Sequence, residues 1–253
     1  MKNSTMNRRQ AMKRIRLMSV ALVGVFAFAT VPCAKAADNG VVKGKIIFKG
    51  DASNYKRTVI DTTKDPNCKK TKSKIGSYNV ILNKKTDPIT IRNVLVFVKS
   101  GLGDRKYEAP KEPVVLRQHG CEYTPHVFGI MEGQPLKIHN DDDTNHNIHF
   151  LPKVNQELNF SQPKKGMEKE VTLRAEDVFK LKCDVHPWMG AHVQVFTHPF
   201  FAVTGKDGTF ELKGLPAGKY VIEAWHEEFG VKTMNVEVAQ DETVNADFTY
   251  DEK

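Results

Sequence analysis

The stretch Val178-Phe-Lys-Leu-Lys-Cys183-Asp-Val-His186-Pro187-Trp-Met189 joins an alternating run to a short loop rich in metal-binding side chains. Along the run, the apolar residues and Cys183 fall on one face and the lysines fall on the other, which is the pattern of a half-buried β-strand. The thiol therefore leaves the core side of a strand at its end. His186 and Met189 follow on a loop that Pro187 stiffens by fixing its own φ angle.

A thiolate, an imidazole and a thioether favour copper, because two His, one Cys and a weak axial Met form a blue-copper site. The second His must come from elsewhere, and the segment Asp-Asp-Asp-Thr-Asn-His146-Asn147-Ile148-His149-Phe150 offers two. Alternation places His146 on the face of Ile148 and Phe150. It places His149 with Asn147, next to a polar loop. We therefore predict His146 as the fourth ligand and His149 as an outward or rim histidine.

These two motifs, Asn-His-Asn-Ile-His-Phe and Cys-x-x-His-Pro-x-Met, resemble the blue copper proteins of the cupredoxin family, above all the amicyanin-like and plastocyanin-like members. The resemblance covers about a third of the chain, and we assign it to a domain at residues 111–197. It implies that His146, Cys183, His186 and Met189 bind one type 1 copper ion. It also implies that Asn147 forms hydrogen bonds near the Cys ligand and ties the two ligand loops together.

The same resemblance implies that the edge of His186, beside Trp188, reaches solvent through an apolar patch and serves as the port for electrons. Zinc is the alternative metal, but structural zinc normally takes four Cys or His ligands and Met is a poor one. The other alternative is that the Cys is a small core residue and each His is structural.

A second resemblance covers Phe201-Ala-Val-Thr-Gly-Lys-Asp-Gly-Thr-Phe-Glu-Leu-Lys-Gly-Leu-Pro-Ala-Gly-Lys-Tyr-Val221, which is similar to the carboxypeptidase regulatory-like, transthyretin-like β-sandwich. The opening Gly-x-Val-x-Gly strand of such modules is missing before Phe201. A suitable opening strand lies far upstream at residues 40–48. We therefore expect a discontinuous sandwich of residues 37–110 and 198–253 with the cupredoxin-like domain inserted. Its expected role is a scaffold, and a carbohydrate or cell-surface partner is the alternative.

Short alternating or apolar runs separated by turn residues predict an all-β protein of two sandwiches, a cupredoxin Greek key and the transthyretin-like sandwich. No segment shows a helical period with caps. Two polar stretches, 51–75 and 152–166, are predicted to be long loops. The predicted strands are 41–48, 78–82, 89–98, 126–131, 136–140, 146–150, 170–173, 178–183, 192–197, 200–204, 209–212, 220–226, 231–238 and 244–250.

The first 36 residues have the order of a signal peptide: a basic segment, an apolar run at 17–31, and Ala34-Lys-Ala36 before the predicted cleavage point. The apolar run is short for a membrane span, and Arg8-Arg9 leaves both Sec and Tat export open. Residues 1–36 hold seven of the 38 Lys and Arg and none of the 30 Asp and Glu, so the remainder carries a net charge of +1. The composition therefore gives no reason to expect nucleic-acid binding.

Export to the periplasm or another oxidising compartment leaves three cysteines, since Cys33 would be removed with the signal peptide. If Cys183 binds metal, Cys68 and Cys121 are a candidate disulfide. The alternatives are two buried thiols or a second metal site with His119 or His126.

The remaining histidines also have expected places. His139 and His192 alternate with polar residues and are expected at the surface. His226 alternates with apolar residues and is expected to be a hydrogen-bonded core residue, with a second site beside His198 as the alternative.

A Cys, two His and a Met leave no strong open coordination position on a copper ion. Such a site suits one-electron transfer between redox partner proteins. We therefore expect an electron carrier and predict no catalytic residue. Multicopper oxidases and copper nitrite reductases need extra ligands, and the chain has no His-x-His, His-Cys or Cys-His sequence. A dinuclear copper site needs two close cysteines. A copper chaperone would favour exposed Met-rich or His-rich tracts, which are absent. A copper-binding or structural sandwich without electron transfer remains the alternative.

Overall fold

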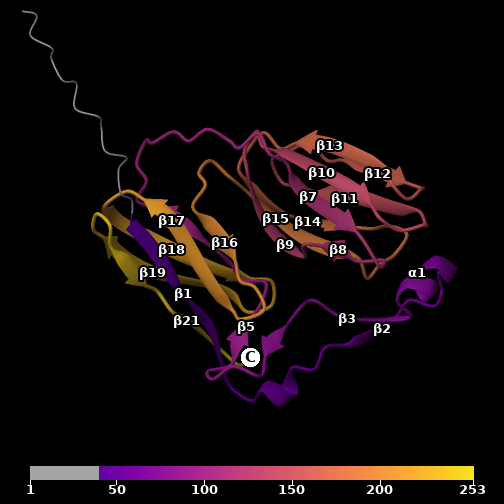
Figure 1. Cartoon of the computed structure of the whole chain (residues 1–253), viewed down its shortest axis with the longest axis horizontal. Coiled ribbons are helices and arrows are strands. Elements are labelled where there is room, and N and C mark those ends of the chain that lie inside the picture. Colours follow the sequence, from indigo (N-terminus) through magenta and orange to yellow (C-terminus); the bar gives the residue numbers. More distant parts are fainter. Residues whose placement is uncertain (1–39) are drawn as a thin grey trace, which may run out of the picture. The chain divides into compact units, whose positions relative to one another are not determined.

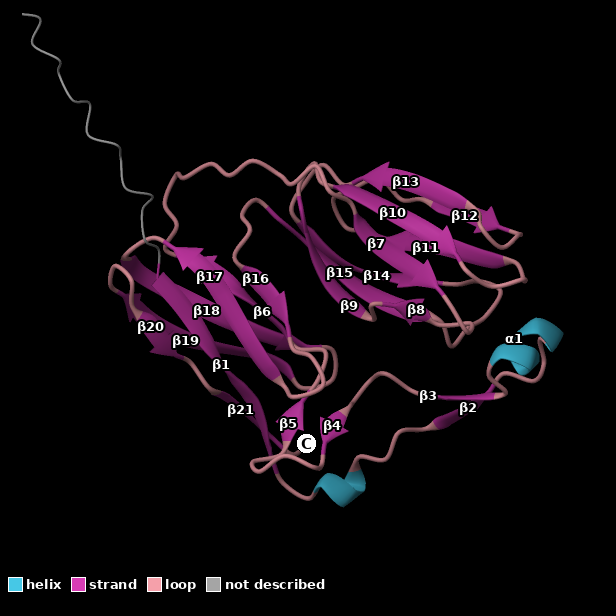
Figure 2. Ribbon diagram, viewed as in Figure 1, coloured by secondary structure: helices cyan, strands magenta, loops and turns pink. Residues whose placement is uncertain are grey.

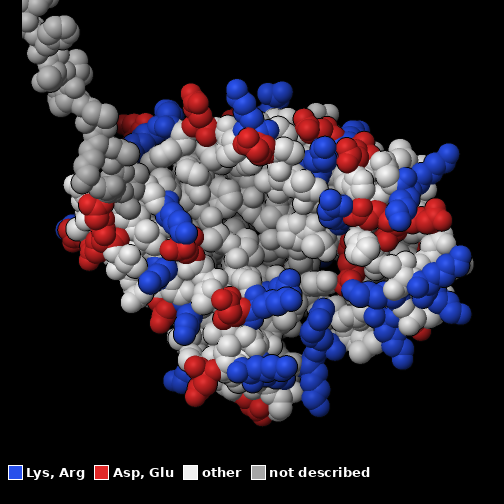
Figure 3. All heavy atoms as spheres, in the orientation of Figure 1, with Lys and Arg blue, Asp and Glu red and all other residues white. Residues whose placement is uncertain are grey.

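The computed structural model describes residues 40–253, and the predicted signal peptide lies outside this range. Within it, nearly all regular structure is β-strand, which confirms the predicted all-β class (Figure 2). The strands form two β-sandwiches and one two-stranded ribbon. No helix of the described residues combines the length and hydropathy needed to cross a membrane. Lys and Arg are interspersed with Asp and Glu over the face shown in Figure 3.

The first sandwich, here the terminal sandwich, takes strands from both ends of the described chain. Its first sheet is centred on β1 and contains β17 (Thr209–Leu215), β1 (Gly40–Lys49), β5 (Thr90–Ile91), β4 (Leu82–Asn83), β20 (Thr243–Asn245) and β21 (Phe248–Asp251). Its second sheet runs in the order β16 (Phe201–Val203), β6 (Leu95–Ser100), β18 (Gly218–His226) and β19 (Gly230–Val238). Figure 1 shows β1 beside strands of the C-terminal end of the chain, and one buried apolar cluster fills the space between the sheets.

The chain leaves the terminal sandwich after β6 and returns at β16, which pairs antiparallel with β6. The intervening residues form the second sandwich, here the central sandwich. Because departure and return occur on neighbouring strands, the insertion does not interrupt the sheet. Phe201 of β16 packs on Phe196 at 4.6 Å between ring centroids. A Cβ atom on Gly129 would lie 2.4 Å from the Phe201 ring, so this contact requires glycine there.

The central sandwich consists of two sheets around its own buried cluster. The first sheet runs in the order β13 (Glu168–Thr172), β10 (Pro135–Asn140), β7 (Val114–Gln118) and β8 (Tyr123–Thr124). The second runs in the order β12 (Asn159–Gln162), β11 (His146–Leu151), β14 (Asp177–Lys182), β15 (Gly190–Phe196) and β9 (Val127–Met131). Parallel pairing of β10 with β7 and of β15 with β9 requires long crossovers between sheets, as in a sandwich.

The prediction of a long loop at 51–75 is wrong. This region contains the 3₁₀ turn η1 (Ala52–Asn54), β2 (Val59–Asp61), α1 (Pro66–Thr71) and β3 (Lys74–Gly76). We name residues 59–76 the strap. Asp65 caps α1 by accepting from the backbone N–H of Asn67 and Cys68, and Pro66 occupies the first turn. The Asp-Pro signal was present in the sequence, but six residues are too few to show a helical period.

Other predictions of strands and loops are also wrong in detail. The predicted strand at 89–98 is two strands, β5 and β6, because Asn93 between them has a φ of 62°. The predicted strand at 78–82 reduces to β4. The predicted loop at 152–166 contains β12, whose inward residue is polar: Gln162 is 2% exposed and donates to the carbonyl of Ile138. A buried glutamine hides the alternation that identifies a strand. The predicted strand at 244–250 is likewise two strands, β20 and β21, and the strands β7 and β8 were not predicted.

His226 is buried at 1% exposure, as expected for a core histidine. Among the described residues it belongs to none of the groups that could hold a metal ion. Its Nδ1 accepts from the backbone N–H of Glu228 at 3.1 Å and of Phe229 at 3.3 Å. Burial lowers the pKa of His226 to about 4. Protonation of Nδ1 would place a ring N–H against these two backbone N–H donors. The folded state therefore favours the neutral ring.

We predict that this histidine makes the terminal sandwich sensitive to acid. Its pKa is lower in the folded state than in the unfolded state, so stability falls as the pH drops from about 6.5 to about 4, by at most ~3 kcal/mol. His226→Asn keeps an acceptor near Nδ1 and cannot be protonated in this range. Urea unfolding at a series of pH values gives the free energy of unfolding at each pH. Between pH 6.5 and 4 this free energy should fall less steeply for the variant than for the native protein. An equal fall in both proteins would contradict the prediction.

Candidate metal centre

The loop Cys183–Met189 closes the hairpin formed by β14 and β15. The Cys183 N–H donates to the Met189 carbonyl at 3.1 Å, and the Met189 N–H donates to the His186 carbonyl at 2.9 Å. Cys183, His186 and Met189 are each 2% exposed. These bonds hold the loop as a closed turn, and the side chains of Cys183 and Met189 belong to the buried core cluster of the central sandwich.

Pairing of β11 with β14 brings the second motif to the same end of the sandwich, with Phe150 opposite Leu181. His146, at the start of β11, is fully buried. His149 lies at the rim, where its Nδ1 is 2.9 Å from Asp184 Oδ2 and its Nε2 is 2.9 Å from Glu157 Oε1. The structure therefore places His146, and not His149, next to the ligand loop.

Three donor atoms converge at this point. The Nδ1 atoms of His146 and His186 are 3.1 Å apart, and His186 Nδ1 lies 3.8 Å from Cys183 Sγ. Bond lengths of about 2.0–2.1 Å to nitrogen and about 2.3 Å to sulfur give separations of roughly 3.3–3.6 Å and 3.6–3.8 Å around one ion. The observed separations fit a metal ion with only small shifts of the rings.

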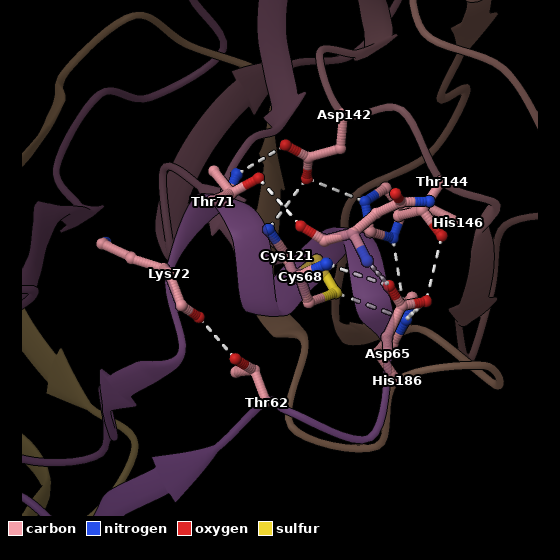
Figure 4. The surroundings of a disulfide bond; sticks show 12 residues. Thr62, Asp65, Cys68, Thr71, Lys72, Cys121, Asp142, Thr144, His146 and His186 are labelled. Atoms are coloured by element: carbon pink, nitrogen blue, oxygen red, sulfur yellow. Dashed lines mark hydrogen bonds and ion pairs between the residues drawn. A yellow bond between two sulfur atoms is a disulfide. The ribbon is translucent and has the colours of Figure 1, made fainter.

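Carboxylates hold the far nitrogen of each imidazole. His146 Nε2 lies 2.9 Å from Asp142 Oδ2, and His186 Nε2 lies 3.2 Å from Asp65 Oδ2 (Figure 4). Asp142 also accepts from the N–H groups of Gly120 and Cys121, both at 2.8 Å. A carboxylate behind a ligating His fixes its tautomer and leaves the other nitrogen free for a metal.

The electrostatics favour an anionic sulfur. Burial raises the pKa of Cys183, but hydrogen bonds from His146 and His186 and from backbone N–H groups outweigh it and lower the pKa to about 5. Burial likewise raises the pKa of Asp142, and its bonds from His146, Cys121 and Gly120 bring the pKa below its usual range. Cys183 is thus a thiolate at neutral pH, the form that binds metals.

Asn147 connects the two segments that carry the predicted ligands. Its backbone N–H donates to Cys183 Sγ at 3.4 Å, and its side-chain oxygen accepts from the Asp184 N–H at 2.9 Å. The side-chain amide also donates to Asn159. These bonds orient the thiolate and fix the loop that follows it.

Cys68 and Cys121 form a disulfide with a Cα–Cα distance of 5.7 Å, and both residues are fully buried. It fastens α1 to the central sandwich, and Cys68 Sγ lies 3.6 Å from His186 Nε2 (Figure 4). The expected location of Cys68 on a surface loop is therefore wrong. Neither cysteine is free to bind a metal with His119 or His126.

The expected exposure of the His186 edge is also wrong. The side chain is 3% exposed, because Asp65 and the disulfide cover the nitrogen that the resemblance places at the surface. Trp188, whose ring centroid is 5.1 Å from that of His186, donates its indole N–H to the Cys121 carbonyl at 3.0 Å. No local sequence pattern indicates this cover, since the strap has the composition of a polar loop.

Comparisons with known proteins cover parts of this chain. Residues 184–251 match the model of the carboxypeptidase regulatory-like domain. No curated protein sequence matches the chain. Among solved structures, a copper-containing nitrite reductase from Thermus scotoductus SA-01 is 23% identical with a TM-score of 0.30, over 39% of this chain and 25% of that one.

A Cu(I) form of an amicyanin variant is 21% identical with a TM-score of 0.31, over 40% of this chain and 98% of that one. A reduced form of another amicyanin variant gives the same identity, score and coverage. This chain spans only a quarter of the nitrite reductase.

We predict that Asp65→Ala uncovers the metal centre. The change removes the cap of α1, which costs about 1 kcal/mol, and removes the oxygen that covers His186 Nε2. Hydrogen exchange at residues 184–189 should accelerate. Asp51→Ala is the matched control, because Asp51 caps η1 by accepting from the Ser53 N–H. Equal exchange rates in both variants would show that the strap does not protect the loop.

Proposed function

We propose that the chain is an exported electron carrier with one type 1 copper ion bound by His146, Cys183, His186 and Met189. The observation that carries this proposal is the convergence of a thiolate and two Nδ1 atoms whose far nitrogens are each held by a carboxylate. The burial of Met189 in the same cluster adds a thioether to this soft donor set. The Cys68–Cys121 disulfide fits an oxidising compartment such as the periplasm.

In this proposal, residues 111–197 form a cupredoxin domain inserted into a carboxypeptidase regulatory-like sandwich of residues 37–110 and 198–253. Support comes from the pairing of β1 with β17 and of β6 with β16, which joins the two flanking segments in shared sheets. The flanking sandwich serves as a scaffold for the copper domain. Redox partner proteins, and no nucleic acid, are the proposed partners.

The residues around the proposed copper ion would favour fast electron transfer because they keep the four ligands from moving when the charge of the ion changes. Copper bound here would supply one-electron chemistry by cycling between Cu(I) and Cu(II). Asp142 and Asp65 keep the two imidazoles in place, and Asn147 keeps the thiolate oriented. The backbone bonds between Cys183 and Met189 hold the loop closed. A donor set fixed in this way reorganises little when its charge changes.

A thiolate beside an imidazole and a carboxylate is also the arrangement of a cysteine nucleophile. In this structure Cys183 is 2% exposed and already accepts from the N–H groups of Asn147 and His186. Its sulfur is thus already oriented by two donors, and its side chain is almost fully buried. This arrangement favours a ligand and disfavours an enzyme.

With the His186 edge covered, we assign the docking of redox partners to the exposed side of the ligand loop. Val185 is 46% exposed, and Pro187 is exposed as well. Both residues lie between ligands in the chain, so a partner that contacts them approaches Cys183 through few bonds. Redox encounters need only small interfaces.

The copper proposal predicts an intense thiolate-to-copper absorption band and narrow copper hyperfine splitting in the EPR spectrum of the copper-loaded, oxidised protein. Cys183→Ser should abolish the band, because serine cannot supply thiolate charge transfer. The matched control is the double variant Cys68→Ser and Cys121→Ser, which removes the disulfide and keeps the four ligands. A colourless native protein with ordinary copper signals would refute the type 1 site.

The docking assignment predicts a charge effect at Val185. Oxidation of the reduced protein by hexacyanoferrate(III), an anion, should slow for Val185→Glu and accelerate for Val185→Lys, each severalfold at low ionic strength. The same pair of changes at Val231, which is 52% exposed in β19, should leave the rate unchanged. Equal effects at both valines would contradict the assignment. A copper-loaded protein that exchanges electrons very slowly would favour the alternative, a copper-binding sandwich without electron transfer.

A further inference from the structure

His126, His192 and Glu227 form a second group of side chains close enough to bind one metal ion. His126 directly precedes β9, and His192 lies in β15 beside it, while Glu227 comes from the turn between β18 and β19 of the terminal sandwich. Their side chains are 9%, 18% and 13% exposed. His192 was expected at the surface, and the turn that carries Glu227 covers it.

Hydrogen bonding fixes the tautomer of His126. Its Nδ1 lies 2.9 Å from the Gly190 carbonyl oxygen, which can only accept, so Nδ1 carries the proton. The other nitrogen, Nε2, points at Glu227 Oε1. A neutral ring would direct a lone pair at a carboxylate, so a cation or a second proton belongs between them. A backbone carbonyl behind a histidine is the usual support of a metal ligand.

The second histidine completes the group. His192 Nε2 lies 3.2 Å from Glu227 Oε2, close to the roughly 3.3 Å that separates nitrogen and oxygen donors around a tetrahedral zinc ion. The group therefore offers two imidazoles and a carboxylate anion.

Aromatic rings hold both imidazoles in place. Tyr78, just beyond the strap, stacks on His126 at 5.0 Å between centroids, and Trp225 packs on His192 at 5.3 Å. All three donor residues line a cavity of about 550 Å³ that also reaches Cys183 and Met189. A ligand set of this kind would therefore leave one coordination position facing an open space.

We propose that His126, His192 and Glu227 form a second metal site, distinct from the copper centre, for a borderline divalent ion such as Zn²⁺. Two His and one Glu with a fourth position open is a common zinc donor set. Because Glu227 belongs to the terminal sandwich and both histidines belong to the central one, the ion fastens the two sandwiches together. This inference does not depend on the copper proposal, since the two sites share no ligand.

The rival explanation is an ion pair alone, in which protonated histidines hold Glu227 without a metal. The two explanations differ in their response to zinc. A metal site gains stability from added Zn²⁺ according to its affinity, whereas an ion pair of protonated histidines gains none.

The test is a titration of Zn²⁺ into copper-loaded protein, followed by calorimetry and thermal unfolding. We expect one zinc ion to bind per chain and the melting temperature to rise. Glu227→Gln keeps the shape and one hydrogen-bond acceptor but removes the charge, and it should weaken zinc binding by roughly 100-fold or more. Glu228→Gln is the matched control one residue away, where the side chain accepts from Asn79, and it should bind zinc like the native protein.

Co²⁺ in place of Zn²⁺ gives a second readout, since its visible bands report tetrahedral coordination directly and should disappear in Glu227→Gln. Circular dichroism establishes that the variant is folded. If copper does not bind, the comparison of native protein with Glu227→Gln still isolates this site, so the two proposals fail separately. Equal zinc binding in both proteins, or no rise in melting temperature, would overturn the inference.

Discussion

The antiparallel pairing of β11 with β14 is the constraint on which the candidate metal centre depends. It sets His146 at the start of one strand beside Cys183 at the end of the other, although the two residues are 37 positions apart in sequence. Register is strict here, because a shift by one residue would turn His146 outward and His149 inward. The buried residues Ile148 and Phe150 lock that register, so hydrophobic packing of the sheet determines which histidine meets the thiolate.

Around this pairing, the two imidazoles and the thiolate are each held by a second bond. The histidines are held by carboxylates and the thiolate is held by backbone N–H groups. Such a centre is pre-organised, because its cost of ordering is met during folding. This arrangement places charged groups in or near the protein interior, which is unfavourable without hydrogen bonds. The carboxylates of Asp142 and Asp65 are tolerated there because each accepts several hydrogen bonds.

The strap adds a layer over the candidate metal centre. A disulfide that closes a loop of 53 residues contributes about 4 kcal/mol in the chain-entropy model. That contribution fastens α1, and with it Asp65, over His186. The strap therefore replaces an open histidine edge with a carboxylate and a disulfide, and it leaves the loop around Val185 as the exposed approach to the centre.

Alternation and residue type were enough to predict the all-β class, the inward orientation of His146 and the grouping of Cys183, His186 and Met189 on one loop. These properties are local, since they follow from side chains that alternate along a strand and from a loop of seven residues. Two structural features escaped because their signals are weak locally: α1 is too short to show a period, and β12 turns a glutamine inward. The cover over His186 and the meeting of His126 and His192 with Glu227 were decided only by tertiary structure. They depend on segments far apart in the chain, and nothing in the neighbouring residues records which distant carboxylate will lie against a given imidazole.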